Sequence, residues 1–295
     1  MTGFIMQWTI TSLDEGKGVR EFLKEQNISK TALTDIKFKG GKIQVNEQEV
    51  TVRYSLKLND VLKIEFPIEE ASHGLVPENI SLDIVYEDEY ILVVNKPIEM
   101  NTIPSREHPS GSVANGVIYH FMNSGIQATA HIVTRLDRNT SGLVLVAKHR
   151  HVHHLLSMQQ RKGRIKRVYE AIAEGTLEPM SGTIEEPIGR KEDSIIQREV
   201  RYDGQYALTH YQVLELFPYY TRLELSLETG RTHQIRVHLS YIGHPLAGDD
   251  LYGGSKKWIN RQALHCKKVE FYHPFFKETL QFTADLPQDL ENLIR

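Results

Sequence analysis

The pattern of apolar and polar residues predicts a small front module at residues 12–66. Within residues 19–23 and 32–36, apolar side chains recur at intervals of three and four, as on one face of an α-helix. Ser29 stands at the start of the second helix, where its side chain can cap free backbone N–H groups, and Gly40-Gly41 ends the helical pattern. Two short helices are therefore expected at the front of the chain.

Strand patterns complete this module, and a linker separates it from the rest. Residues 43–50 read as a tight hairpin and residues 61–66 as a closing strand, which gives the order helix, helix, turn, small sheet. The following residues 67–80 contain two prolines, one glycine and three glutamates, a composition typical of a linker. We therefore expect a second, larger domain at residues 81–295.

The second domain alternates between strand and helix patterns without a strict strand–helix repeat. Apolar runs and two-residue alternation predict strands at residues 82–86, 91–97, 143–147, 168–173, 211–217 and 222–228. Helical spacing predicts helices at residues 149–161 and 232–241, the second of which Gly243 ends. This order favours an α+β fold with a mixed or mainly antiparallel sheet.

The composition is that of an ordinary soluble globular protein, with 40% hydrophobic and 25% charged residues in a chain of 295. Cys266 is the one cysteine, which excludes an intrachain disulfide and a cysteine-based metal site. No stretch approaches the roughly 18 apolar residues of a membrane helix, and the N-terminus has no basic region or long apolar run. We expect a cytoplasmic protein that contacts no membrane and is, by default, a monomer.

Net charge does not indicate a nucleic-acid-binding protein, because 35 Lys and Arg residues accompany 38 Asp and Glu residues. Basic residues are nevertheless concentrated between Lys148 and Glu170, where seven of them accompany one acid. Five of the seven lie close together, at Arg161, Lys162, Arg164, Lys166 and Arg167. From charge alone, this basic run 161–167 is either a solvated helix end or a surface that binds phosphates.

A polar loop before the expected strand 143–147 holds the most informative segment. Residues 134–143 read TRLDRNTSGL, and the turn-forming residues after Asp137 can orient the loop through local hydrogen bonds. An isolated aspartate in such a loop commonly serves as a turn or cap residue. A loop that leads into a strand is, however, also a place where a rigid scaffold presents a catalytic side chain.

Three short blocks together resemble the RluA-like pseudouridine synthases, which isomerise uridine in RNA. The first is residues 134–143, which fit the family pattern of Arg-Leu-Asp, two variable residues and Thr-Ser-Gly. The second, residues 167–171, reads RVYEA, and the third, residues 227–253, begins LETGRTHQIRVHL. All three occur in the family's order, and the resemblance covers residues 81–295. It implies an α+β catalytic domain that needs neither a cofactor nor a metal ion.

The resemblance also assigns roles to three residues. Asp137 matches the family's catalytic aspartate, a carboxylate that attacks or stabilises an electron-poor centre, much as in glycosidases. Arg231 is the expected partner that keeps this carboxylate charged through a bidentate contact. Tyr169 matches a tyrosine that stacks on the target base and is a candidate for removing the ring-carbon proton. Whether Asp137 attacks the sugar or the base stays open.

A uracil inside folded RNA can reach Asp137 only if it leaves the base stack. Arg135, two residues before the nucleophile, is expected to project from the same loop and fill the vacated space in the RNA. The basic run 161–167 leads directly to Tyr169, which makes it the best candidate for positioning phosphates beside the cleft.

The front module resembles the S-four-like RNA-binding module, named from a ribosomal small-subunit protein and found in other RNA-modifying enzymes. The resemblance rests on residues 19–23 (VREFL), 41–46 (GKIQVN) and 58–62 (LNDVL). It implies that basic side chains contact RNA, with matching candidates at Lys24, Lys30, Lys37, Lys39 and Lys42. Because residues 1–66 hold ten basic and nine acidic residues, this basic surface is expected to be weak.

Departures from the family pattern concern the choice of substrate. Thr134 stands where histidine is usual, Arg167 where lysine is common, and residues 98–103 (IEMNTI) where a run with glycine and histidine is usual. Relatives act on large-subunit ribosomal RNA, on transfer RNA or on both. The front module makes ribosomal RNA our first expectation and leaves transfer RNA open.

Two other functions fit parts of the sequence. A catalytically inactive RNA-binding or ribosome-assembly factor could keep the fold, although the presence of Asp137, Tyr169 and Arg231 argues against it. An enzyme that hydrolyses the N-glycosidic bond would need a second acid or a bound water, and the motif blocks offer no obvious second carboxylate. His149 and His153 have the spacing of a helical metal-ligand pair, but no nearby acid or cysteine completes a convincing set.

Overall fold

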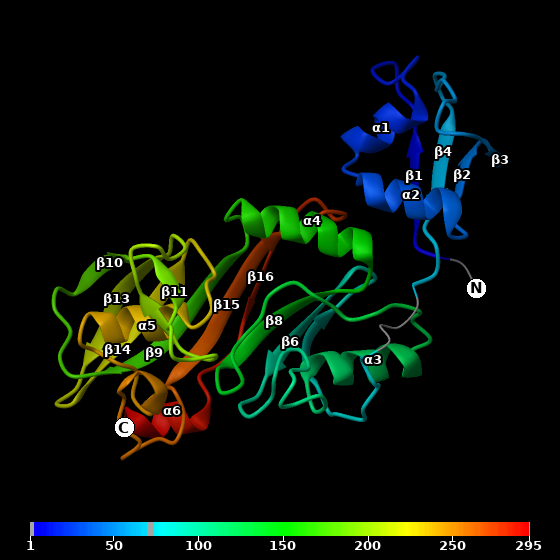
Figure 1. Cartoon of the computed structure of the whole chain (residues 1–295). Coiled ribbons are helices and arrows are strands. Elements are labelled where there is room, and N and C mark those ends of the chain that lie inside the picture. Colours follow the sequence, from blue (N-terminus) through cyan, green and yellow to red (C-terminus); the bar gives the residue numbers. More distant parts are fainter. Residues whose placement is uncertain (1–2, 70–73, 295) are drawn as a thin grey trace.

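The computed structural model describes residues 3–69 and 74–294, and the front of the chain forms a small module beside a larger body (Figure 1). The module contains two helices and a four-stranded sheet of order β1-β4-β2-β3. Its elements are β1 (Ile5–Thr9), α1 (Val19–Glu25), α2 (Lys30–Phe38), β2 (Lys42–Val45), β3 (Gln48–Glu49) and β4 (Val61–Glu65). Val19, Leu23, Ile36 and Leu62 are fully buried together, so the module has a hydrophobic core of its own.

The two helices and the hairpin of this module form where the sequence pattern predicts them. Ser29 Oγ accepts a hydrogen bond from the backbone N–H of Ala32 at 3.1 Å, as expected of an N-cap. β1, however, lies upstream of the predicted boundary at residue 12 and pairs antiparallel with β4. Its side chains alternate only between exposed and half-buried positions, so the sequence carries little apolar signal for this strand.

The larger body is built on a ten-stranded, mainly antiparallel sheet. Eight strands follow the order β10-β13-β14-β9-β15-β8-β6-β5, while β16 pairs with β15 and β7 with β8. The strands are β5 (Asp83–Glu87), β6 (Ile91–Lys96), β7 (His131–Ile132), β8 (Ser141–Ala147), β9 (Lys166–Glu174), β10 (Ser181–Glu185), β13 (Leu208–Leu216), β14 (Tyr220–Leu227), β15 (Leu264–Tyr272) and β16 (Thr279–Thr283). The prediction of an α+β fold with a mixed or mainly antiparallel sheet is confirmed.

A small hairpin and several helices complete the larger body. They are α3 (Val113–Asn123), α4 (Arg150–Arg161), β11 (Ile188–Arg190), β12 (Arg198–Val200), α5 (Gln234–Tyr241), the 3-10 helix η1 (Asp250–Tyr252) and α6 (Gln288–Leu293). The sequence pattern predicted α4 and α5 but missed α3, α6 and six strands of the larger body: β7, β10, β11, β12, β16 and the long strand β15. Polar residues such as His265 and Lys267 interrupt the apolar alternation of β15, which explains why it was missed.

The contact of β15 with β8 fixes the loop that contains Asp137. This pairing is parallel, and it places Cys266 opposite Gly142 at the start of β8. Gly142 has a φ of +113°, and a Cβ atom there would lie 2.3 Å from the carbonyl oxygen of Cys266. Only glycine fits this position, because any side chain would collide with the neighbouring backbone. The polar loop therefore ends against the middle of the sheet.

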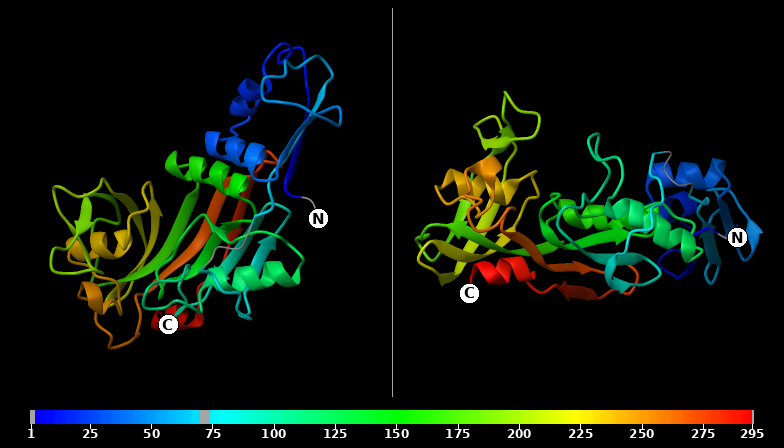
Figure 2. Two further views of the ribbon diagram at one scale, coloured as in Figure 1. Left: turned by 45° about the vertical axis from the view of Figure 1, so that its right-hand side comes forward. Right: turned by 90° about the horizontal axis from the view of Figure 1, so that it is seen from below.

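The front module contacts the larger body at the start of α4 (Figures 1 and 2). Phe4 stacks on His149 with ring centroids 4.4 Å apart, and Asp35 on α2 pairs with Arg150 at 2.5 Å. Glu69 accepts a hydrogen bond from the backbone N–H of Arg150 at 2.7 Å. The middle of the predicted linker, residues 70–73, lies outside the described residues. Among the helices of the described ranges, none combines the length and apolar character of a membrane span.

Candidate active site

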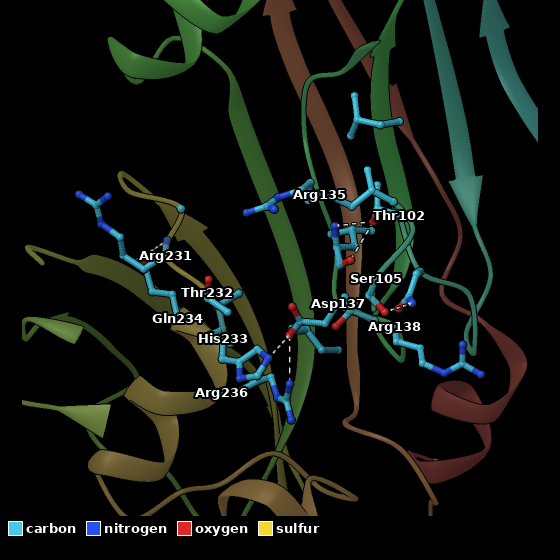
Figure 3. A pocket seen from close by; sticks show the side chains of 18 of the residues that line it. Thr102, Ser105, Arg135, Asp137, Arg138, Arg231, Thr232, His233, Gln234 and Arg236 are labelled. Atoms are coloured by element: carbon cyan, nitrogen blue, oxygen red, sulfur yellow. Dashed lines mark hydrogen bonds and ion pairs between the residues drawn. The ribbon is translucent and has the colours of Figure 1, made fainter. Parts of the chain in front are cut away.

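A cavity of about 790 Å³ opens where three segments distant in the sequence meet (Figure 3). Its walls come from residues 101–108, residues 132–140 and residues 227–236, together with side chains of β9 such as Tyr169. Each of the three sequence blocks singled out above contributes to this lining. The fold therefore gathers the three blocks around one site.

Asp137 projects into this cavity from the loop before β8 (Figure 3). The backbone N–H of Thr140 donates to the carbonyl oxygen of Asp137 at 3.1 Å and closes the turn. The side chain is 29% exposed, and its Oδ2 accepts a hydrogen bond from Arg236 Nη1 at 3.1 Å. The carboxylate thus has a fixed cationic partner and is still accessible from the cavity.

Arg236 bridges two carboxylates from inside α5. Its Nε and Nη2 donate to the two oxygens of Asp249 at 2.7 and 2.8 Å, and its Nη1 donates to Asp137. Burial by itself would lower the pKa of Arg236, but its bonds and charge interactions with Asp249 and Asp137 raise that pKa above its ordinary value. Since Asp249 is buried and holds the guanidinium in place, Arg236 is oriented before any substrate binds.

The prediction that Arg231 pairs with Asp137 is wrong. Arg231 is exposed, lines the cavity, and donates from Nε to the carbonyl oxygen of Tyr206 at 2.9 Å. It precedes α5, and Figure 3 shows its side chain turned away from Asp137. The sequence offered no means of choosing between the two arginines, because that choice depends on the turn at His233, which has a left-handed φ of 58°.

Tyr169 lies in the cavity wall with 4% of its surface exposed. Arg167 Nη1 donates to its hydroxyl oxygen at 3.1 Å. Burial is the largest influence on the pKa of Tyr169 and raises it well above the ordinary value, so the phenol is protonated in the free protein. Arg135 is exposed and points across the cavity from the Asp137 loop (Figure 3). Both predicted site residues therefore share the cavity with Asp137.

The other predicted RNA contacts, apart from Arg167, lie on surfaces outside the cavity. At the end of α4 and the start of β9, the exposed basic residues are Arg161, Lys162, Arg164 and Lys166. They lie next in sequence to Gln160 and Arg167, which line the cavity. Lys30 and Lys37 are exposed on α2 of the front module. The basic run 161–167 thus borders the site, while the two lysines belong to a separate surface.

Two threonines hold the backbone of the Asp137 loop, and both lie at positions where the sequence departs from the family pattern. The buried Thr102 hydroxyl donates to the carbonyl oxygen of Leu136 at 2.8 Å and accepts from the N–H of Leu136 at 3.0 Å. Thr134 is buried too, and its Oγ1 accepts from the backbone N–H of Leu145 at 2.9 Å. Sequence reasoning could not identify these roles, because the partners are backbone groups that leave no residue pattern.

Lys96 anchors the same loop and was not singled out in the sequence. Its side chain is fully buried, and Nζ donates to the carbonyl oxygens of Pro97 at 2.7 Å, Met100 at 2.9 Å and Arg138 at 3.1 Å. Burial lowers the pKa of Lys96 to about 7, and the charge of Asp137 opposes that shift. The available signal was a lysine inside the apolar strand pattern of residues 91–97.

The two histidines considered as metal ligands make other contacts. His149 precedes α4 and stacks on Phe4, and His153 Nε2 lies 3.2 Å from the carbonyl oxygen of Ile132. Within residues 3–69 and 74–294, no three potential His, Cys, Asp or Glu ligands are grouped around a common point.

Comparisons with known proteins agree with this geometry. Residues 90–241 match the family described as RNA pseudouridylate synthase. The chain is 54% identical to the uncharacterized RNA pseudouridine synthase YjbO of Bacillus subtilis, over 94% of this chain and 98% of that protein. It is 41% identical to ribosomal large subunit pseudouridine synthase D of Escherichia coli O6:H1, over 74% of this chain and 71% of that protein. Among solved structures, human RNA pseudouridylate synthase domain containing 1 shares the fold, with a TM-score of 0.60 and 24% identity over 74% of this chain and 94% of that one.

Proposed function

Because the chain belongs to the RNA pseudouridylate synthase family and is an enzyme that isomerises uridine in RNA, we propose that Asp137 is its nucleophile and that large-subunit ribosomal RNA is its substrate. The observation that carries the first part is the Asp137 carboxylate, which lies in a large cavity and is paired with a buried, pre-oriented arginine. The relatives described as ribosomal large subunit pseudouridine synthases support the second part.

The reaction needs few chemical groups from the protein. The bond from the sugar to a uracil ring nitrogen breaks, the uracil turns, and the same sugar carbon bonds to a ring carbon. A carboxylate can supply the electron pair that stabilises or traps the electron-poor intermediate. At the end, the ring carbon loses its proton and the ring nitrogen released from the sugar gains one, so no external group or electron is consumed. Tyr169, buried beside Asp137 and protonated in the free protein, is our candidate for stacking on the base.

The cavity fits a nucleotide that has left its base stack. Its volume of about 790 Å³ is in the range of ordinary small-molecule sites, and a nucleoside is of that class. Arg135 extends from the loop that holds Asp137, and we propose that it occupies the space that the flipped uridine leaves. The basic run 161–167, which is exposed except at the half-buried Arg167, borders the cavity and would hold the flanking phosphates.

We also propose that the front module is an S-four-like RNA-binding module. Its separate hydrophobic core and its exposed Lys30 and Lys37 support this assignment. Lys37 lies 4.5 Å from the ring centre of Phe38, which is 72% exposed and offers a face on which a base can stack. The module would hold structured RNA while the larger body acts on one uridine as a cytoplasmic monomer.

Tritium release from RNA tests this proposal. Large-subunit ribosomal RNA and transfer RNA, transcribed with tritium at the uracil ring carbon that forms the new bond, are incubated with the wild type and with Asp137→Asn. We expect release from ribosomal RNA by the wild type only, while Asp137→Asn binds the same RNA with unchanged affinity. Release by Asp137→Asn would exclude Asp137 as the nucleophile. Release from transfer RNA alone would replace the proposed substrate, and free uracil as product would identify a hydrolase.

A further inference from the structure

His233 lies at the Asp137 carboxylate but has no part in the function proposed above. Its Nε2 is 3.7 Å from Asp137 Oδ2, the oxygen that also accepts the hydrogen bond from Arg236. Its side chain is 11% exposed and lines the cavity. The backbone at His233 has a φ of 58°, a left-handed conformation that non-glycine residues seldom adopt. Such strain is commonly retained where it places a functional side chain.

The second ring nitrogen of His233 is held by Tyr252. The Tyr252 hydroxyl lies 2.7 Å from His233 Nδ1 and accepts a hydrogen bond from the backbone N–H of Arg198 at 2.9 Å. Among the residues that the structure describes, Nδ1 is the only hydrogen-bond acceptor recorded for this hydroxyl. Burial, the largest influence, raises the pKa of Tyr252, so the phenol keeps its proton and has a hydrogen to donate to Nδ1.

These contacts favour one protonation state of the imidazole. Burial is the largest influence on the pKa of His233 and lowers it, with Arg236 and Arg198 acting in the same direction and Asp137 and Asp249 opposing. The ring is therefore neutral near pH 7 and carries one N–H. With Nδ1 as the acceptor from Tyr252, that hydrogen lies on Nε2 and faces Asp137 Oδ2.

We propose that His233 is a positioning residue whose Nε2–H, fixed by Tyr252, binds Oδ2 of Asp137 together with Arg236 and so presents Oδ1 to the substrate. In Figure 3, both dashed lines to Asp137 end on the same oxygen, and the other oxygen is turned toward the cavity. With two donors on one oxygen, rotation of the carboxylate is restricted and the free oxygen keeps its lone pairs for the reaction. The distance of 3.7 Å would shorten to a hydrogen bond in the substrate complex. This inference rests on the proposed role of Asp137.

Two neutral replacements of His233 distinguish the hydrogen-bond donor at Nε2 from the left-handed backbone conformation of this residue. In Gln, the amide nitrogen can reach the position of Nε2, whereas the shorter Asn reaches only that of Nδ1. We expect His233→Asn to lower kcat by about 10-fold with KM unchanged, and His233→Gln to stay within about 3-fold of the wild type. Asn tolerates a left-handed backbone better than Gln, so a purely structural role predicts the opposite order. Equal activity of the two variants, or a better Asn variant, would overturn the proposal.

A spectroscopic measurement tests the same point without depending on turnover. In protein labelled with ¹⁵N-histidine, the ring nitrogens of His233 are those whose signals shift in Tyr252→Phe. We expect an unprotonated Nδ1 and a protonated Nε2 at pH 7. A proton on Nδ1 would refute the proposal even if both His233 variants failed to fold. If the wild type releases no tritium from any RNA, the proposed function fails instead, and the protonation state of His233 is still measured independently.

Discussion

At the scale of single residues, the site depends on one buried arginine. Arg236 holds Asp249 with two hydrogen bonds and Asp137 with a third, whereas the side chain of Arg231 has one hydrogen bond among the described residues, to the carbonyl oxygen of Tyr206. A planar guanidinium with several N–H groups can serve both carboxylates at once, and a lysine ammonium cannot reproduce that geometry. The two arginines lie five residues apart in the chain but differ entirely in environment.

Arg236→Lys is therefore expected to be far more harmful than Arg231→Lys. The first variant leaves the buried Asp249 poorly paired, which should lower the free energy of unfolding by about 3 kcal/mol and reduce turnover by about 100-fold. The second changes an exposed side chain and should alter the free energy of unfolding by less than about 0.5 kcal/mol. Urea unfolding and tritium release measure both quantities. Similar losses of stability in the two variants would contradict the assignment of Arg236.

Thr102 offers a second test at this scale. Thr102→Val keeps the shape of the side chain but removes the hydroxyl that serves both the N–H and the carbonyl of Leu136. Two buried backbone groups lose their partner, so we expect the free energy of unfolding to fall by about 1–3 kcal/mol and kcat to fall with it. Thr183→Val removes an exposed hydroxyl that contacts His210 and is the matched control. Unchanged kcat in Thr102→Val would show that this contact does not position Asp137.

At the scale of elements, α4 carries an acid-sensitive residue at its start. His151 is buried, stacks on Phe66 of the front module, and its two ring nitrogens have no hydrogen-bond partner among the described residues. Burial, with a smaller contribution from His154, lowers its pKa from 6.5 to about 4. The unfolded chain therefore binds a proton below pH 6.5 that the folded protein does not bind until about pH 4.

Because of this difference in proton binding, the free energy of unfolding falls as the pH is lowered from 6.5 to about 4. Since one pKa unit corresponds to about 1.4 kcal/mol, His151 should contribute a loss of about 3 kcal/mol between pH 7 and pH 4. His151→Leu cannot take up the proton, so its unfolding free energy should depend less on pH by about that amount. Urea unfolding at several pH values measures this, with the exposed His108→Leu as control. If His151→Leu followed the wild-type pH dependence, the imidazole would not be the responsible group.

At the scale of the whole molecule, RNA binding is expected to involve two separate basic surfaces. The basic run 161–167 borders the cavity, and Lys30 and Lys37 lie on α2 of the front module. The front module contacts the larger body through Phe4, Asp35 and Glu69 at the start of α4. The basic run begins at the end of this helix. An RNA that contacts both surfaces would therefore pass along α4.

Arg164→Gln combined with Lys166→Gln tests the surface beside the cavity. Loss of two phosphate contacts should weaken RNA binding and reduce the slope of log K against log salt by about 1.5. Lys257→Gln combined with Lys277→Gln removes two exposed lysines that do not line the cavity and serves as the charge-matched control. Binding of each double variant to the substrate RNA is measured between about 50 and 200 mM salt, the usual range for such slopes. This measurement distinguishes the two double variants. An equal change in both slopes would assign the effect to net charge alone.

Local patterns in the sequence were sufficient to predict many of the helices and strands. The helix at α4, the cap at Ser29 and the buried strand β8 each depend on residues a few positions apart, and each forms as expected. The family blocks likewise identified Asp137 and Tyr169 as residues of one site, because each block is a short continuous segment. The weakly apolar β1 and the polar-interrupted β15 escaped this reasoning, since long-range pairing rather than local pattern makes them strands.

The contacts within the site were decided only by the tertiary structure. Arg236 and Asp137 are separated by 99 residues, and Thr102 and Leu136 by 34, so no spacing rule connects them. The choice of Arg236 over Arg231 follows from a left-handed turn at His233 and from the buried Asp249. The sequence by itself therefore indicated Asp137 and Tyr169 as candidates for one site, whereas the packing of distant segments determined which side chains touch, Arg236 among them, because hydrogen-bond partners depend on position in space.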